Sequence, residues 1–215
     1  GASGLGNRAS PSRHDLPLVG GHPIHLPGNA GGTFSLNLRI PTWAHEPRLW
    51  LNGKPQPKRP DLERGYWKIE REWRAGDRVA IRFPMEIERM EADPRVTENR
   101  GKVALMRGPL VYCLEGVDHG GGVRSLFLPR DSVLTTRFEP NLLGGIQILT
   151  GRAWAREASR DWAQLYQSAG QTHQTYLRAI PYCFWDNREP GEMVVWIPES
   201  PGVAEPPLSE GLSSP

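Results

Sequence analysis

The sequence predicts an all-β protein composed of two antiparallel β-sandwich (jelly-roll-like) units. In several short segments apolar residues alternate with polar ones, at the two-residue period of half-buried strands. Turn residues separate these segments at the spacing typical of sandwiches. Gly and Pro account for 24 and 21 of the 215 residues, a content that favours turns over helices. A chain of this length can hold two domains of about 100 residues each.

We expect the chain to divide into four segments. Residues 1–32 are predicted to be a disordered lead-in or linker, with one short strand near Ile24–Leu26. Residues 33–100 form sandwich unit I, and residues 101–197 form sandwich unit II. Residues 198–215 are predicted to be a disordered tail. The lead-in and the tail are rich in Gly, Pro and Ser and have no hydrophobic period, so neither has the pattern of a packed element.

Strands of unit I are expected at Thr33–Ile40, Leu49–Leu51, Tyr66–Trp73 and Val79–Met85. Pro41 ends the first strand, because proline has no N–H to donate to a neighbouring strand. Asn52-Gly53 follows the second strand and predicts a type I′ hairpin turn, since both residues tolerate positive φ angles.

The middle of the chain is predicted to hold a bent or bulged strand pair. A charged connector, Glu86–Asn99, leads to two apolar runs, Val103–Met106 and Leu110–Leu114. Gly108-Pro109 separates the runs, and a proline fits only at a strand start, an edge or a bulge. We expect this pair to join the first half of the chain to the second.

Further strands are expected in unit II at Ser125–Leu128, Ile146–Leu149, Thr175–Ile180 and Met193–Ile197. Ala153–Gln167 has a helix-forming composition. Both a helix and an irregular loop with a helical turn are left open there.

Charge and composition exclude several classes of protein. The net charge is +2, and the 26 basic and 24 acidic residues are interspersed, without the basic stripe typical of nucleic-acid binding. No apolar run approaches the ~18 residues that a membrane-spanning helix needs. The first residues lack the apolar centre of a signal peptide. We therefore expect a soluble chain with no nucleic-acid or membrane partner, and the cytoplasm is the favoured location.

Few residues have the chemistry of a metal ligand or a nucleophile. His22 and His25 are three residues apart, but Pro23 and the flanking glycines deny them a helix, and we interpret them as a loop pair without function. Cys113 and Cys183 could pair with each other, but one lies in a strand run and the other among aromatic residues, so we expect two buried free thiols. They also lack CxxC spacing and a neighbouring histidine that would lower a thiol pKa. No catalytic, cofactor-binding or metal-binding residue is predicted in this chain.

Three carboxylate pairs have the composition that glycoside hydrolysis commonly needs, namely two carboxyl groups about 5–10 Å apart. They are Glu70 with Glu72, Glu115 with Asp118, and Asp186 with Glu189. Glu70 and Glu72 share the polar face of a predicted strand, which indicates a solvated face. Asp186-Asn187-Arg188, beside Trp185, is interpreted as a structural turn, with binding of a sugar hydroxyl as the alternative.

The eight tryptophans are further candidates, because aromatic rings can stack on sugars. Four of them lie in or beside predicted strands and are expected in the core or between domains: Trp67, Trp73, Trp185 and Trp196. The environment of Trp43, Trp50, Trp154 and Trp162 is left open. Residues expected to be mostly buried are Trp73, Ile81, Phe83, Leu110 and Tyr112.

Four motifs resemble the C-terminal part of the β-L-arabinofuranosidase family, glycoside hydrolase family 127. They are FSLNLRIPTW at Phe34–Trp43, YWKIEREWRAGD at Tyr66–Asp77, VALMRGPLVYCLEGVD at Val103–Asp118 and AIPYCFWDNREPGEMVVWI at Ala179–Ile197. The resemblance implies a layout in which a helical catalytic barrel precedes β-sandwich domains. It also implies removal of terminal β-L-arabinofuranose by a zinc-bound cysteine and a glutamate acid/base, all within the barrel. The adjacent Cys-Cys pair of that barrel is absent here, so no catalytic or zinc residue is carried over.

The sequence therefore predicts the non-catalytic C-terminal portion of such a glycosidase, which braces the barrel. Its expected partners are the upstream barrel and, through the parent enzyme, plant-type arabinose-containing glycans. Zinc would belong to the barrel, and a homodimer is left open. The alternative is a free-standing carbohydrate-binding module, which would expose aromatic residues and bind sugars.

Overall fold

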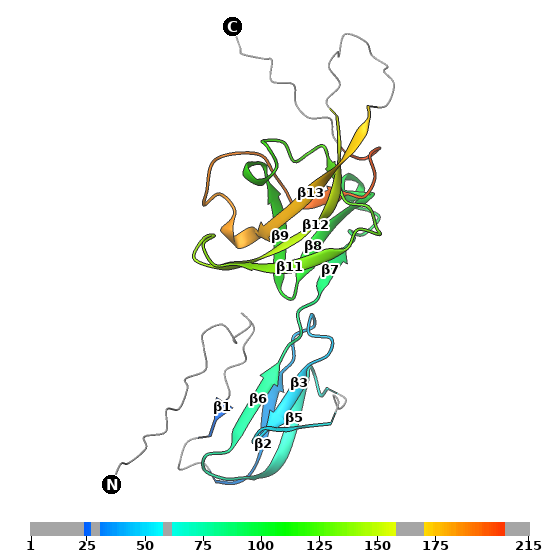
Figure 1. Cartoon of the computed structure of the whole chain (residues 1–215). Coiled ribbons are helices and arrows are strands. Elements are labelled where there is room, and N and C mark those ends of the chain that lie inside the picture. Colours follow the sequence, from blue (N-terminus) through cyan, green and yellow to red (C-terminus); the bar gives the residue numbers. More distant parts are fainter. Residues whose placement is uncertain (1–23, 27–30, 58–61, 158–169, 205–215) are drawn as a thin grey trace, which may run out of the picture. The chain divides into compact units, whose positions relative to one another are not determined.

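The structure is a computed structural model that describes residues 24–26, 31–57, 62–157 and 170–204. Within these residues almost all regular structure is β-strand, with three short 3-10 turns (Figure 1), which confirms the all-β prediction. None of the described helical turns is long and apolar enough to cross a membrane. The chain divides into two compact units, Gly1–Met85 and Glu86–Pro215.

The first unit contains two antiparallel sheets with a core between them. One sheet has the strand order β1-β6-β3-β4, and the other consists of β2 and β5. The strands are β1 (Ile24–His25), β2 (Gly32–Arg39), β3 (Arg48–Leu51), β4 (Lys54–Pro55), β5 (Tyr66–Trp73) and β6 (Arg78–Arg82). The core consists of Leu38, Ile40, Ala44, Leu49, Leu51, Trp67, Trp73 and Val79. The short strand expected near Ile24–Leu26 is confirmed as β1, which pairs with β6.

Hydrogen bonds connect two turns of the first unit, one at Asn52-Gly53 and the other at Arg74–Asp77. Asn52 and Gly53 have φ angles of 50° and 78°, as a type I′ turn requires, so the predicted hairpin is confirmed. The Asn52 side chain donates to Asp77 Oδ1 (2.7 Å) and accepts from the N–H of Arg78 (2.7 Å). The N–H of Arg74 donates to the other oxygen of Asp77 (2.9 Å). The hydrogen bond from Arg74, followed by that from Asn52, lowers the pKa of Asp77.

Trp73 is the largest fully buried side chain of the first unit. It is 1% exposed, its Nε1–H donates to the carbonyl of Phe34 (3.0 Å), and its ring stacks on the ring of Phe34 at 5.7 Å between centroids. The prediction that Trp73 is buried is confirmed. Ile81 and Phe83 are partly buried and pack against the same cluster.

Replacing Trp73 with alanine should therefore lower the free energy of unfolding by about 3–5 kcal/mol, because it empties a large site and removes a hydrogen bond. Chemical denaturation followed by circular dichroism measures this loss. Glu70→Ala, on the exposed face of the same strand, is the control and should change the free energy by no more than about 0.5 kcal/mol. A loss below about 1 kcal/mol for Trp73→Ala would contradict its role in the core.

The described residues of the second unit form a nine-stranded antiparallel sheet. Its main path has the order β10-β12-β13-β9-β8-β15, and β7, β11 and β14 pair with β8, β12 and β9. The strands are β7 (Ile87–Met90), β8 (Lys102–Arg107), β9 (Leu110–Glu115), β10 (Leu126–Phe127), β11 (Leu134–Glu139), β12 (Ile146–Arg156), β13 (Thr172–Pro181), β14 (Met193–Val194) and β15 (Trp196–Pro198).

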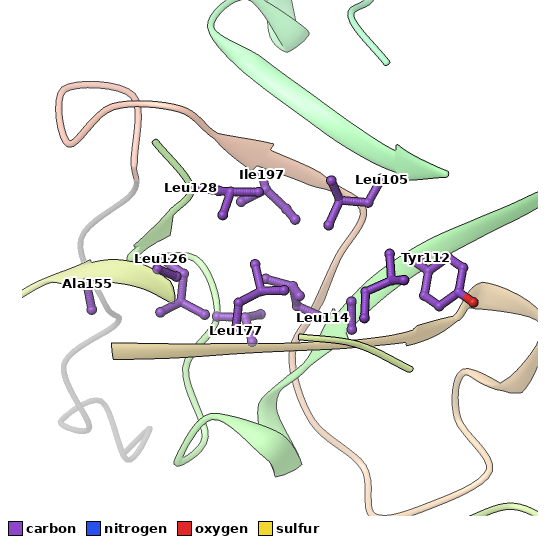
Figure 2. Packing of buried hydrophobic residues seen from close by; sticks show 12 residues of the cluster. Leu105, Tyr112, Leu114, Leu126, Leu128, Ala155, Leu177 and Ile197 are labelled. Carbon is purple, nitrogen blue, oxygen red and sulfur yellow. The ribbon is translucent and has the colours of Figure 1, made fainter. Parts of the chain in front are cut away.

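The sheet curls around its larger core, shown in Figure 2, and a smaller cluster of Cys113, Ile146, Ile148 and Ile180 is also buried. The two ends of the strand path meet where the N–H of Leu128, just after β10, donates to the carbonyl of Pro198 in β15 (2.7 Å). Tyr112 is fully buried, as predicted, while Leu110 is only partly buried against this core. The core cluster consists of Leu105, Tyr112, Leu114, Val123, Leu126, Leu128, Leu149, Ala153, Ala155, Leu177, Ala179 and Ile197.

The second unit begins earlier than residue 101, where the sequence placed the boundary. Part of the expected charged connector is strand β7, which pairs with β8 from Ile87 opposite Arg107 to Met90 opposite Ala104. Arg89 of this strand is half-buried, and its guanidinium donates to the carbonyls of Pro129 (2.9 Å) and Ser132 (3.0 Å). Burial lowers the pKa of Arg89. The charge of this segment therefore did not indicate a solvated connector, because a charged strand residue can bind backbone carbonyls.

The Gly108-Pro109 step is a tight hairpin turn. Arg107 pairs directly with Leu110, so two residues connect β8 and β9, and no bulge separates them. Gly108 has a φ angle of 57°, which the first central position of a type II′ turn requires. The expected bend or bulge is therefore wrong, and the pair lies wholly within the second unit.

The second unit differs from the sequence prediction in three further places. Strand β12 continues to Arg156, so Ala153–Arg156 is strand rather than helix or loop, while residues 158–169 lie outside the described residues. Strand β11 was not anticipated. The disorder expected of the tail is wrong for its first residues, because Ala204 is buried and its carbonyl accepts a hydrogen bond from Arg156 (3.1 Å).

Candidate functional site

The structure separates the three predicted carboxylate pairs by environment. Glu70 and Glu72 are exposed on β5, as expected. Asp186 and Glu189 are also exposed. Glu115 and Asp118, in contrast, are buried side by side through a shared arginine, Arg188. We call Glu115, Asp118 and Arg188 the arginine clamp.

Local backbone geometry brings the clamp residues together. Glu115 ends β9, and Asp118 ends the following 3-10 turn, η3 (Gly116–Asp118). Gly116 must be small, because a Cβ there would lie 2.6 Å from the carbonyl oxygen of Gly121. Its N–H donates to the carbonyl of Glu192 (2.8 Å), which fixes the end of the loop that carries Arg188.

The guanidinium of Arg188 binds both carboxylates. It forms a two-pronged contact with Asp118, with Nη1–Oδ1 at 3.0 Å and Nη2–Oδ2 at 2.6 Å. Its Nε donates to Glu115 Oε2 (3.0 Å), and its Nη2 also donates to that oxygen. The backbone N–H of Asp186 donates to the other oxygen of Glu115 (3.2 Å). The side chains of Glu115, Asp118 and Arg188 are 6%, 4% and 14% exposed, so the ion pairs are shielded from water.

Two further residues complete the cluster. Arg178 Nη1 donates to Asp118 Oδ1 (3.0 Å), which gives this carboxylate a second cation. His119 Nδ1 lies 2.8 Å from the carbonyl of Glu115, and His119 Nε2 accepts the N–H of Arg178 (3.2 Å). These partners require a neutral imidazole with its proton on Nδ1. Burial lowers the pKa of His119, in agreement with that state.

The charges around the clamp fix its protonation. Burial raises the pKa of Asp118, but the hydrogen bonds and positive charges of Arg188 and Arg178 outweigh it, and the net shift is downward. The hydrogen bond that Arg188 donates to Asp118 is the main cause that raises the pKa of Arg188. A glycosidase acid needs a raised pKa and access to the leaving oxygen. Asp118 has neither, so the clamp fits a structural role.

Loss of Arg188 should destabilise the second unit strongly. Arg188→Met leaves two buried carboxylates without their shared cation, and we expect a loss of about 3–5 kcal/mol in unfolding free energy. Arg188→Lys keeps the charge but not the two-pronged geometry, so its loss should be intermediate. Thermal and urea unfolding measure both variants. Arg95→Met, which removes an exposed pair with Asp93, is the control and should leave the midpoint nearly unchanged. An equally mild effect of Arg188→Met would rule out the clamp as a main support.

Acid should also destabilise the second unit. His119 has a lowered pKa in the folded state, so unfolding takes up a proton as the pH falls through its ordinary value of 6.5. The lowered pKa of Asp118 acts in the same direction at lower pH, below its ordinary value of 3.8. We expect the midpoint temperature of thermal unfolding to decrease as the pH is lowered from about 7.5 to about 5.5. His119→Asn should flatten that slope, and an unchanged slope in this variant would contradict the assignment.

The two cysteines differ from each other. Cys113 is a buried free thiol, as expected, and burial raises its pKa to about 12, with Glu115 as the next cause. Cys183, in the 3-10 turn η4 (Tyr182–Phe184), is a free but exposed thiol, so its predicted burial is wrong. The thiol of Cys113 keeps its proton at neutral pH and is therefore a poor nucleophile and metal ligand.

The tryptophans also divide into buried and accessible rings. Trp67 is buried like Trp73, and Trp196 is half-buried in β15. Trp185 is exposed and stacks on Tyr182, with centroids 5.8 Å apart, so a core position is wrong for this residue. Trp43 packs edge-on against Phe83. Trp162 lies outside the described residues.

Each unit has a groove with a tryptophan in its lining. In the first unit Trp50 lines a groove of about 450 Å³ together with His45, Glu46 and Gln56. In the second unit Trp154 lines a groove of about 610 Å³ on the face of β11, β12 and β13. Sequence patterns left both tryptophans unassigned, because a period of two does not say which face of a sheet is covered.

Zinc, which the family resemblance implies, does not fit the described residues. Among them, no group of three His, Cys, Asp or Glu side chains is placed to hold a metal ion. His22 and the side chain of His25 lie outside the described residues. Of the two cysteines, Cys113 is protonated and buried, and Cys183 is exposed at a separate turn.

Comparison with known proteins gives consistent matches over both units. The glycoside hydrolase family 127 C-terminal domain matches residues 87–198, and the middle domain of the β-L-arabinofuranosidases of that family matches residues 12–85. These matches place the chain among the glycoside hydrolases. The chain belongs to glycoside hydrolase family 127, over the family's middle and C-terminal domains. The boundary between the two matches coincides with the division of the structure at Met85.

Individual relatives agree with this assignment. A non-reducing end β-L-arabinofuranosidase of Bifidobacterium longum is 36% identical over 186 residues, which cover 81% of this chain and 28% of the relative. The crystal structure of a family 127 β-L-arabinofuranosidase from Geobacillus stearothermophilus T6 is 44% identical with a TM-score of 0.78, covering 86% of this chain and 29% of that one. Another family 127 β-arabinofuranosidase structure is 29% identical with a TM-score of 0.77, covering 89% and 32%. In each of these proteins the matching region is one part of a longer chain.

Proposed function

We propose that this chain is the non-catalytic C-terminal portion of a β-L-arabinofuranosidase-like glycoside hydrolase. The observation that carries the proposal is the pair of family matches, to a middle domain and a C-terminal domain, over nearly the whole described chain. The chain spans only 28% of its Bifidobacterium longum relative, which is a non-reducing end β-L-arabinofuranosidase. The parent enzyme would hydrolyse terminal β-L-arabinofuranosides in plant-type arabinose-containing glycans.

We also propose that the chain supplies no catalytic, cofactor-binding or metal-binding residue. The buried carboxylates Glu115 and Asp118 are bound by Arg188, and the buried thiol of Cys113 holds its proton. Zinc and the catalytic groups would belong to a helical barrel of the parent enzyme. The partner of this chain is then that barrel, and a homodimer of the parent is a further arrangement that the chain could set.

The role we assign to the chain is to brace the barrel. Antiparallel sheets with buried cores are rigid supports, because backbone hydrogen bonds and closely packed side chains hold the strands in place. A free-standing carbohydrate-binding module is the competing function. The observation in its favour is the exposed groove of the second unit, which contains aromatic and polar side chains.

A chimaera with a relative tests the bracing role. The matching region of the Geobacillus stearothermophilus enzyme would be deleted, or replaced by this chain, and the temperature of half-inactivation measured with a chromogenic β-L-arabinofuranoside. We expect the deletion to inactivate well below the intact enzyme and the chimaera to regain most of the loss. Arg188→Met in the chimaera, which weakens the second unit, is the matched negative variant. A deletion as stable and active as the intact enzyme would contradict bracing.

Assay of this chain alone tests the absence of catalytic residues. We expect no release of arabinose from the same substrate and no stoichiometric zinc by elemental analysis. Turnover that disappears in Cys113→Ser, together with one zinc per chain, would contradict this part of the proposal and make Cys113 a nucleophile.

A further inference from the structure

The outer face of the second unit's sheet carries a groove of about 610 Å³, and no residue of the arginine clamp lines it. It lies over β11, β12 and β13, which are adjacent in the sheet (Figure 1). The residues that matter for its chemistry are Asp131, Thr135, Arg152, Trp154, Gln174 and Tyr176. The volume is within the range of about 300–1,000 Å³ that small-molecule sites occupy.

Strand register explains why these side chains share one face. Arg152 of β12 pairs with Tyr176 of β13, and Trp154 pairs with Gln174 two residues further along. Ala153, between Arg152 and Trp154, and Leu177, next to Tyr176, are fully buried in the core. Since side chains alternate across a strand, the four groove residues point to the opposite, outer face. The two aromatic rings therefore occupy diagonal positions of one strand pair, within reach of a single ligand.

The groove combines exposed aromatic surface with free hydrogen-bonding groups. Tyr176 is 54% exposed, and Trp154 is half-buried. Within the described part of the chain, the side chains of Arg152 and Gln174 have no hydrogen-bond or ion-pair partner. At one edge the hydroxyl groups of Thr135 and Thr150 lie 3.1 Å apart and form a hydrogen bond. Donors and acceptors that are unused in the free protein are available to a polar ligand.

We propose that this groove binds a neutral oligosaccharide. A sugar ring has an apolar C–H face, which packs on an aromatic side chain, and hydroxyl groups at its rim, which pair with amide, guanidinium and carboxylate groups. Arg152 and Asp131 are the two charged residues of the lining and have opposite signs, so the groove favours no net ligand charge. The backbone ladder of β12 and β13 holds the rings in place before binding, which lowers the entropic cost of association.

Titration of the intact chain with defined neutral oligosaccharides tests the proposal. The probes are arabinopentaose, xylopentaose and cellopentaose, with trigalacturonate as an anionic comparison, followed by calorimetry and tryptophan fluorescence. We expect saturable binding of at least one neutral probe and no tighter binding of the anion. Tyr176→Ala should weaken binding about tenfold or more, because it removes an exposed stacking surface. Arg152→Met and Gln174→Ala should weaken it through lost hydrogen bonds.

Phe138→Ala is the matched control, since Phe138 is an exposed aromatic residue of β11 that does not line the groove. It should bind as tightly as the unaltered chain. No saturable binding of any neutral probe up to about 10 mM would overturn the proposal, as would equal affinity in Tyr176→Ala. Self-association that Tyr176→Ala abolishes, without sugar binding, would assign the groove to a second copy of the chain instead. The bracing assay uses no oligosaccharide probe, so the two proposals fail independently.

Discussion

Two buried carboxylates impose the strictest requirement on the second unit. Glu115 and Asp118 lie at the end of β9, where low exposure makes an uncompensated negative charge costly. Arg188 meets both with one planar guanidinium, and Arg178 adds a second positive charge at Asp118. The loop after β13 must fold back to deliver Arg188 to this corner. The position of that loop, and of the Tyr182–Trp185 stack on it, follows from this charge balance.

The clamp also connects elements that are distant in sequence. Glu192, at the far end of the same loop, accepts the N–H of Gly116 and that of Val123. Strand β14 then pairs with the end of β9, and β15 pairs with the start of β8, where Pro198 lies opposite Lys102, so both strands join the hairpin at the end away from Gly108. The hydrogen bond from Leu128 to Pro198 joins the ends of the strand path, so the sheet curls around its core.

The two faces of β12 and β13 carry out different tasks. Their inner residues, including Leu149 and Leu177, fill the core with small or branched side chains. On the outer face, the groove residues Trp154 and Tyr176 keep aromatic rings at the surface, beside the unpaired side chains of Arg152 and Gln174. A support for a larger enzyme needs only the first of these faces. The second is where a function beyond support would be found, and it uses the same rigid strand pair.

Much of the fold followed from the sequence itself. The period of two located most strands, including β2, β5 and β6, because strand side chains alternate between core and solvent. Asn52-Gly53 defined its hairpin, because few residue pairs accept two positive φ angles. The four motifs also indicated the family, which the domain matches then confirmed.

The tertiary structure decided what depends on neighbours distant in the chain. The sequence places Arg89 in a solvated connector, yet its guanidinium donates hydrogen bonds to backbone carbonyls of a loop distant in sequence. In the sequence, Glu115 and Asp118 form one of three candidate carboxylate pairs, and only the return of Arg188, some seventy residues later, makes them a buried ion cluster. Trp154 and Trp185 became accessible, and Trp73 buried, because coverage of a sheet face is set by packing. Local pattern fixes which way a side chain points, whereas burial and charge compensation are properties of the assembled fold.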